Sequence, residues 1–202
     1  MSRKLQYFDV AGYAEGIRYL LHYGKLNFED VRYKREEWPI KDVKDALPFG
    51  QMPTYEEDGR TINQSMAIAR YVGNKIGLVP SDPWEQAVLD AAVLNVYDFG
   101  KKLIDNIKDQ DPEKKEENQK KINETVEYYL TRFEKELKAG NGHFVGKLSW
   151  ADFIIVGLVE TFNVYLGTDL HKNYPTLTAL ILKVNTLPGI KEYIASRTPY
   201  TK

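Results

Sequence analysis

Two stretches in the first third of the chain decide the fold: Lys4-Leu-Gln-Tyr-Phe8, and Phe49-Gly-Gln-Met-Pro-Thr54 followed by Asn63-Gln-Ser-Met66. The first stretch predicts a short buried strand that ends near a glycine. In the second, an X-Pro bond presents the backbone, and Ser65 is expected to open a helix whose free N–H groups can hold a carboxylate. Together they predict a small-molecule site on an α/β domain.

Extended and helical segments alternate after the first strand. Residues 15–23 repeat apolar side chains at helical spacing, and residues 27–33 alternate apolar and polar side chains as a strand does. This order predicts two parallel strands joined by a crossover helix. Residues 34–48 are charged and contain prolines, so we expect an irregular loop or a short helix there.

A hairpin and a second helix complete this half. Residues 53–57 and 60–62 flank Asp58-Gly59, which is a strong signal for a tight hairpin turn. Ser65 is a suitable N-cap for a helix that runs to Ile76. The order βαβ followed by ββα matches a thioredoxin-like domain.

For the sequence after residue 78, the patterns predict helices only. Prolines in residues 78–83 mark the predicted boundary, which gives a first domain at 1–78 and an all-helical domain at 82–202. Apolar residues recur at helical spacing over 84–106 and 122–137, whereas 108–121 is charged and reads as a solvated helix end or loop.

The most apolar helix is expected at residues 153–166. Ser149-Trp-Ala-Asp152 has the form of a capping box directly before it. Residues 175–184 and 188–195 predict two short terminal helices.

Composition narrows the function. Apolar residues make up 43% and charged residues 28%, which fits a folded domain. A net charge of -1 gives no basis for binding nucleic acid or an anionic membrane. The chain has no cysteine, so any sulfur chemistry must use the thiol of another molecule. Without a signal sequence or a long apolar run, we expect a cytoplasmic protein.

Tyr7 is the candidate for chemistry, although a tyrosine on a strand more often serves packing. If Met52 and Ser65 converge near it, a cysteine-containing peptide could bind with its sulfur at the hydroxyl. Lowering a thiol pKa of about 8.5 by ~2 units requires roughly 2.7 kcal/mol of preference for the anion. One charge-assisted hydrogen bond contributes about 1.5–3 kcal/mol. Met52-Pro53 itself is either a rigid turn or a cis peptide that pairs with an extended ligand.

The chain resembles the cytosolic glutathione transferases, and among them the sigma class, which is related to haematopoietic prostaglandin D synthase. The resemblance covers nearly the whole chain, and its motifs are Leu5-Gln-Tyr-Phe8, Gly16-Ile-Arg-Tyr-Leu20, Glu37-Trp-Pro39, Leu47-Pro-Phe-Gly-Gln-Met-Pro53, Asp58-Gly59, Asn63-Gln-Ser-Met-Ala-Ile-Ala-Arg-Tyr71 and Ser149-Trp-Ala-Asp-Phe153.

The resemblance implies a role for each matching residue around glutathione. Tyr7 would stabilise the thiolate, and Met52 before a cis Pro53 would pair with the cysteinyl backbone. Gln64 and Ser65 would hold the γ-glutamyl end. The remaining contacts would come from Trp38, Lys44 (with Lys41 as an alternative) and Gln51 at the glycyl end, and from Asp98 at the γ-glutamyl amine of the neighbouring subunit's ligand.

The second substrate is expected to be an apolar electrophile in a pocket lined by Phe8, Tyr13, Ile104 and Leu158. Many sigma members carry an arginine where this chain has Tyr13. Two acidic positions linked to a metal in the vertebrate prostaglandin synthase are Asn95 and Tyr97 here, so we predict no metal.

The sequence therefore predicts a homodimeric, cytoplasmic glutathione transferase with glutathione as co-substrate and an apolar electrophile as partner. Two alternatives stay open. One is a non-enzymatic relative, either crystallin-like or a carrier of hydrophobic ligands. The other is an isomerase of the prostaglandin D synthase type.

Overall fold

The computed structural model describes residues 2–108 and 111–200. Its first half is built on one mixed sheet in the order β2-β1-β3-β4. The strands are β1 (Arg3–Phe8), β2 (Glu29–Tyr33), β3 (Thr54–Glu57) and β4 (Arg60–Asn63). β1 runs parallel to β2 and antiparallel to β3, which forms a hairpin with β4. The predicted parallel pair and hairpin are confirmed.

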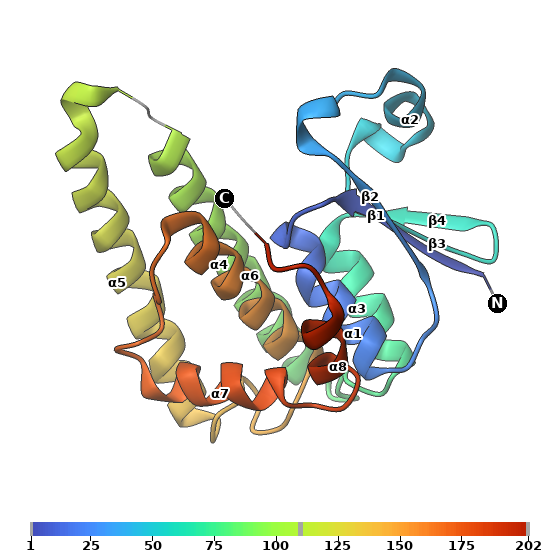
Figure 1. Cartoon of the computed structure of the whole chain (residues 1–202). Coiled ribbons are helices and arrows are strands. Elements are labelled where there is room, and N and C mark those ends of the chain that lie inside the picture. Colours follow the sequence, from blue (N-terminus) through green and yellow to red (C-terminus); the bar gives the residue numbers. More distant parts are fainter. Residues whose placement is uncertain (1, 109–110, 201–202) are drawn as a thin grey trace.

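Helices cover the sheet on both sides. α1 (Glu15–Tyr23) and α3 (Ser65–Lys75) lie together on one side, and α2 (Lys41–Ala46) stands on the other (Figure 1). Short 3-10 turns η1 (Gly12–Ala14), η2 (Arg35–Glu37) and η3 (Pro48–Gly50) connect these elements. Residues 34–48 thus form short helical pieces, within the range that the sequence predicts.

The second half is helical, as predicted. Its elements are α4 (Pro83–Lys108), η4 (Pro112–Lys114), α5 (Lys115–Ala139), α6 (Trp150–Leu166), α7 (Pro175–Asn185) and α8 (Ile190–Ser196). α6 is the core helix, and the predicted capping box is present, because the Ser149 N–H donates to Asp152 Oδ2 at 2.7 Å. No helix in the described ranges is long and apolar enough to cross a membrane.

The charged segment at residues 108–121 is in large part a solvated helix end, one of the two forms predicted for it. Residues 115–121 form the largely exposed first two turns of α5, which begins before the apolar period predicted from Ile122. Exposed ion pairs at helical spacing, such as Lys121 with Glu117 at 2.6 Å, support this charged segment. Residues 109–110 of the same predicted segment lie outside the described residues.

The two halves meet where α1 crosses α6 at two glycines. A Cβ on Gly157 would lie 2.6 Å from the Gly16 nitrogen, and a Cβ on Gly16 would lie 2.8 Å from the Ile154 Cα. Because real Cβ atoms do not approach a backbone that closely, only glycine allows this crossing. The N-terminal domain is therefore fixed against the core helix by backbone contact.

A buried ionic cluster joins the end of the described chain to α1. Glu15 and Arg18 are fully buried, and Arg18 Nη1 lies 3.1 Å from Glu15 Oε2. Arg18 Nη1 also donates to the Val10 carbonyl at 2.9 Å, just beyond β1. From the far side, Arg197 pairs with Glu15, and the Tyr200 hydroxyl donates to Glu15 Oε2 at 2.8 Å.

Candidate active site

The Tyr7 hydroxyl lies beside the turn that follows β1. Tyr7 is 6% exposed, and its oxygen accepts a hydrogen bond from the Tyr13 backbone N–H at 3.2 Å. Gly12, at φ +50°, makes room for the hydroxyl, since a Cβ there would lie 2.6 Å from the oxygen. Among the described residues no acceptor takes the hydroxyl's own hydrogen, so that hydrogen is free to be donated to a ligand.

The protonation state of Tyr7 suits a donor. Burial raises the pKa of Tyr7 to about 12, against the hydrogen bond from Tyr13 and the nearby positive charges of Arg35 and Arg18. The phenol therefore stays protonated at neutral pH. It can stabilise an anion by donating its proton in a hydrogen bond, but it cannot act as a base there.

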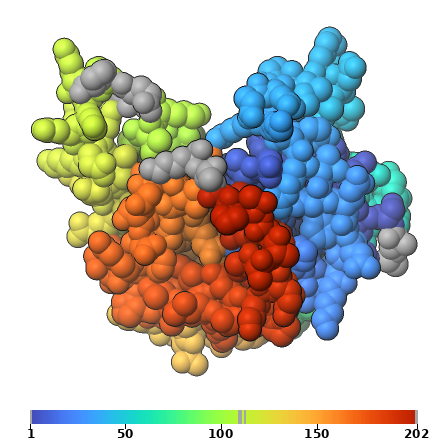
Figure 2. Space-filling view, viewed as in Figure 1, coloured from blue at the N-terminus to red at the C-terminus, as the bar shows by residue number. Residues whose placement is uncertain are grey.

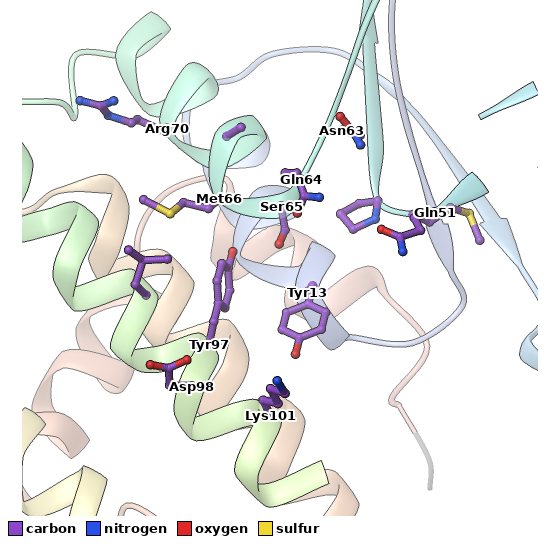
Figure 3. A pocket seen from close by; sticks show the side chains of 14 residues that line it. Tyr13, Gln51, Asn63, Gln64, Ser65, Met66, Arg70, Tyr97, Asp98 and Lys101 are labelled. Carbon is purple, nitrogen blue, oxygen red and sulfur yellow. The ribbon is translucent and has the colours of Figure 1, made fainter. Parts of the chain in front are cut away.

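A cavity of about 660 Å³ opens next to Tyr13, between the start of α3 and α4 (Figure 3). It brings together seven residues predicted from the sequence: Tyr13, Gln51, Met52, Pro53, Gln64, Ser65 and Asp98. These come from four separate segments of the chain. The Met52–Pro53 peptide is cis, which settles the choice between the two forms considered for it.

The start of α3 differs from the prediction that Ser65 is its N-cap. Gln64 occupies the N-cap position with φ 70°, Ser65 is the first helical residue, and no side chain caps the helix. The N–H groups of the first turn have no partner within a helix, so they are available to a ligand. The side chains of Gln64 and Ser65 both line the cavity, and Figure 3 shows them on the side of Tyr13.

Trp38 and Lys44 lie outside the cavity lining. Trp38 packs edge-on against Phe8, with ring centroids 5.5 Å apart. The Lys44 side chain runs along Gly50, where a Cβ would lie 3.3 Å from Lys44 Cε. Its alternative, Lys41, pairs with Asp45 at 2.5 Å, so Lys44 is the amine of the two without a carboxylate partner among the described residues.

Of the four residues predicted for the electrophile pocket, Tyr13 lines the cavity and the other three do not. Phe8 packs against Tyr7 with centroids 5.4 Å apart, and Tyr13 packs edge-on against Tyr97 at 5.4 Å. Ile104 is half-buried on α4. Leu158 is 3% exposed in the core of the helical domain and does not line the cavity. Figure 2 shows the surface hollowed between the blue lobe around residues 35–50 and the yellow-green end of α4 and start of α5.

Tyr97 was considered in the sequence only as a replaced metal position, but it lines the cavity. Figure 3 shows its ring rising from α4 toward Ser65 and Met66. Burial raises the pKa of Tyr97, and the neighbouring Ser65 side chain acts against the rise. A usable signal existed, because Leu94, Tyr97, Asp98 and Lys101 share one face of a helix.

Within the described ranges no three His, Asp or Glu side chains are grouped to hold a metal ion. The predicted lack of a metal stays a prediction. The arrangement instead offers a protonated phenol, an unpaired backbone at a cis peptide, an open helix start and a nearby carboxylate. Such a set can bind a small peptide with an anion at its centre.

Comparisons with known proteins agree with this geometry. Residues 3–74 match the family model "Glutathione S-transferase, N-terminal domain", and residues 97–197 match "Glutathione S-transferase, C-terminal domain". A "Glutathione S-transferase" of Anopheles gambiae is 40% identical, over 96% of each chain. A "Hematopoietic prostaglandin D synthase" of Gallus gallus is 38% identical, also over 96% of each.

A solved structure is also similar along the whole chain. The "prostaglandin synthase D of Nilaparvata lugens" superposes with a TM-score of 0.91 and 36% identity, over 99% of this chain and 100% of that one. Both halves of the fold and the segments that carry the site lie inside the matched regions. This chain therefore belongs to the glutathione S-transferase family.

Proposed function

We propose that this protein is a sigma-class glutathione transferase that activates the thiol of glutathione for attack on apolar electrophiles. One observation carries the proposal. The Tyr7 hydroxyl receives a hydrogen bond from the Tyr13 N–H at 3.2 Å and keeps its own hydrogen free, beside a cavity formed by the residues expected to bind glutathione.

The activation is a shift of the thiol pKa. A free thiol has a pKa of about 8.5, so a bound thiol with a pKa near 6.5 needs about 2.7 kcal/mol of preference for the thiolate. A hydrogen bond from Tyr7 to the anion contributes about 1.5–3 kcal/mol, which covers most of that requirement. The raised pKa of Tyr7 supports the role, because a phenol that ionised first would repel the thiolate.

The remaining residues would orient the peptide. In the proposed complex, the Met52 backbone pairs with the cysteinyl residue, and Gln64 with Ser65 holds the γ-glutamyl end. The glycyl end is bound by Trp38, Lys44 and Gln51. The cis Met52–Pro53 bond and the uncapped start of α3 support this orientation.

A homodimer in the cytoplasm is part of the proposal. In it, Asp98 reaches the γ-glutamyl amine of the glutathione bound to the neighbouring subunit. Two large apolar side chains support a partner surface: Phe49 is 88% exposed at the end of the loop before β3, and Leu94 is 52% exposed on α4 beside Asp98. Domain limits of 1–78 and 82–202 fit the proline-bearing connection between α3 and α4.

Prostaglandin isomerisation is the second candidate activity. The Gallus gallus relative and the Nilaparvata lugens structure carry that function in their names. Against this activity, the turn after β1 presents Tyr13 at the position where many sigma members carry an arginine. A third candidate, a carrier or structural relative without catalysis, has the same fold and differs only in turnover.

The test compares wild type with Tyr7→Phe in the conjugation of 1-chloro-2,4-dinitrobenzene. Loss of one hydrogen bond to the thiolate is expected to lower kcat by about 10- to 100-fold. Spectrophotometric titration of bound glutathione should show a higher thiol pKa in the variant. Calorimetry should show nearly unchanged glutathione affinity.

Tyr128→Phe is the matched control, because Tyr128 is half-exposed on α5, away from the cavity. It should leave all three measurements unchanged. A wild-type protein that binds glutathione but does not conjugate any member of a panel of aldehydes, hydroperoxides and aryl halides would instead support the carrier. Turnover of prostaglandin H2 alone would support the isomerase.

A further inference from the structure

Arg35 connects the two domains beside Tyr7. It lies in η2, directly after β2, and its Nη1 donates a hydrogen bond to the hydroxyl of Tyr165 near the end of α6. Its guanidinium carbon lies 6.0 Å from the ring centroid of Phe8 and 5.9 Å from that of Tyr165. The cation thus lies beside one aromatic ring of each domain, and the Phe8 ring in turn packs against Tyr7.

Arg35 has no carboxylate partner among the described residues. By contrast, Arg32 on β2 and the buried Arg18 both form an ion pair with Asp30. A guanidinium offers five N–H donors, of which the Tyr165 hydroxyl takes one. The remaining donors and the full positive charge are available to a ligand.

The charge of Arg35 reaches the reacting group. Phe8 follows Tyr7 on β1 and packs on its ring at 5.4 Å, so Arg35, Phe8 and Tyr7 are successive neighbours. The positive charge of Arg35 lowers the pKa of Tyr7, against the larger effect of burial. An electrophile that extends from the sulfur along the Phe8 ring would therefore reach this cation.

We propose that Arg35 determines specificity by binding a carboxylate of the electrophile, so that the site prefers apolar electrophiles that carry a carboxylate. This inference rests on the proposed function and names its substrate class. The planar guanidinium fork matches a carboxylate in two parallel hydrogen bonds. The Phe8 and Tyr165 rings on either side suit the apolar body of such a molecule, as in an oxidised fatty acid with a conjugated ketone.

The reaction on such a molecule is a conjugate addition. The glutathione sulfur forms a bond to the β-carbon, and the electron pair of the C=C bond moves through the carbonyl to give an enolate. The enolate takes up one proton from solvent, which replaces the proton lost by the thiol. Nothing leaves, and no other reactant is needed.

Ethacrynic acid and its methyl ester test the proposal, because both carry the same conjugated ketone and only the acid carries a carboxylate. For Arg35→Gln, kcat/KM for the acid is expected to fall by about tenfold. The values for the ester and for 1-chloro-2,4-dinitrobenzene should change by less and alike, through the effect of the Arg35 charge on Tyr7, so the ratio of acid to ester isolates the carboxylate contact. Arg35→Lys keeps the positive charge but loses the planar guanidinium fork. Its kcat/KM for the acid should lie between those of wild type and Arg35→Gln.

Arg60→Gln is the matched control, since it removes an exposed arginine from the turn end of β4. It should leave the ratio of acid to ester unchanged. An equal loss for acid and ester in Arg35→Gln, or no change in their ratio, would overturn the proposal.

Binding of the two ready-made glutathione conjugates separates this proposal from the proposed function. In calorimetry, wild type should bind the acid conjugate more tightly than the ester conjugate, and Arg35→Gln should lose that preference. If wild type conjugates nothing but shows this pattern, the enzyme assignment fails and the role of Arg35 holds. If wild type conjugates all three substrates but prefers the acid neither in kinetics nor in calorimetry, the proposed role of Arg35 fails and the enzyme assignment holds.

Discussion

At the scale of single residues, the position of the Tyr7 hydroxyl depends on the residue beneath it. Gly12 has a positive φ and leaves no room for a Cβ, whose nearest neighbours would be the Tyr7 oxygen at 2.6 Å and Cε1 at 2.8 Å. Hydrogen bonding to the Tyr13 N–H fixes the same oxygen from the other side. The position of the hydroxyl proposed to act on the thiol is therefore set by backbone atoms of a tight turn.

We predict that Gly12→Ala loses activity while it remains folded. The new methyl group must displace the phenol, and a shift of about 1 Å at a reacting group costs up to 100-fold in rate. The positive φ adds about 1 kcal/mol of strain. Conjugation kinetics with 1-chloro-2,4-dinitrobenzene, together with urea denaturation, measure both effects.

Gly59→Ala provides the control for the strain. Gly59 also has a positive φ, at +77°, but a Cβ there would meet nothing within 4 Å, and it lies at the tip of the β3–β4 hairpin. Its variant should show a similar loss of stability with normal turnover. Equal turnover in the two variants would mean that the phenol tolerates displacement.

Residue types in the sequence identified much of the candidate site, but not the nearby cation of Arg35. Tyr7, Met52 and Ser65 were singled out because their types suit the chemistry, and the structure brings Met52 and Ser65 to one cavity beside Tyr7's neighbour Tyr13. Arg35 was missed, since its local sequence shows only a charged loop. Its position depends on Tyr165, which is 130 residues away.

At the scale of secondary-structure elements, Glu57 at the end of β3 holds three elements together. It accepts hydrogen bonds from Arg3 Nε of β1 at 2.8 Å, and from the Tyr71 hydroxyl at 2.6 Å and Lys75 Nζ at 2.8 Å, both on α3. Burial acts to raise the pKa of Glu57, but these hydrogen bonds outweigh it and lower the pKa from 4.5 to about 2.

We predict that Glu57→Gln lowers the free energy of unfolding by about 3 kcal/mol at neutral pH. A depressed carboxyl pKa stabilises the fold fully above the unfolded value of 4.5, and this contribution is lost as the pH falls toward 2. The difference between wild type and variant should therefore shrink over that range. Urea denaturation at several pH values measures it.

Glu56→Gln is the neighbouring control. Glu56 faces the other side of β3 and pairs with Lys4 at 3.2 Å, with about a third of its side chain exposed. Removal of such a pair should change stability by less than about 1 kcal/mol. If both variants behave alike, the interactions of Glu57 do not join the sheet to α3.

Boundaries of elements were predictable where apolar periodicity was strong. α1 was predicted at residues 15–23, the bounds it has in the structure. The start of α5 was left open between a helix end and a loop, because its first turns are exposed and charged and carry no apolar period, although Lys and Glu are good helix formers. The cap of α3 was misassigned by one residue, since a Gln at positive φ is not an expected cap.

At the scale of the whole molecule, the joint between α1 and α6 decides how the domains are held. No sequence pattern pairs Gly16 with Gly157, because the contact joins two helices far apart in the chain and depends on the crossing geometry. The sequence therefore predicted two domains but not how they pack.

We predict that Gly157→Ala lowers the free energy of unfolding by about 1–3 kcal/mol. The added carbon would meet the backbone of α1 at 2.6 Å, and only a shift of the whole helix can relieve the clash. Since α1 follows the turn that positions Tyr7, kcat should fall as well. Urea denaturation and conjugation kinetics test both consequences.

Gly100→Ala is the comparison within α4. Its Cβ would lie 3.2 Å from the tip of the Phe162 side chain, a milder approach than the 2.6 Å to backbone at Gly157, and alanine favours a helix by about 1 kcal/mol over glycine. Its stability should change by less than about 1 kcal/mol. A larger loss than in Gly157→Ala would contradict the importance of the backbone crossing.

The cluster around Glu15 has a consequence for how the protein is made. A ribosome releases β1 and α1 early, and N-terminal domains generally begin to fold during synthesis. Yet Glu15, which is fully buried, takes two of its partners from Arg197 and Tyr200. The charges behind the turn that holds Tyr7 thus stay incompletely paired until those residues leave the exit tunnel, so a nascent chain cannot complete the surroundings of Tyr7 before residues 197–200 have been translated.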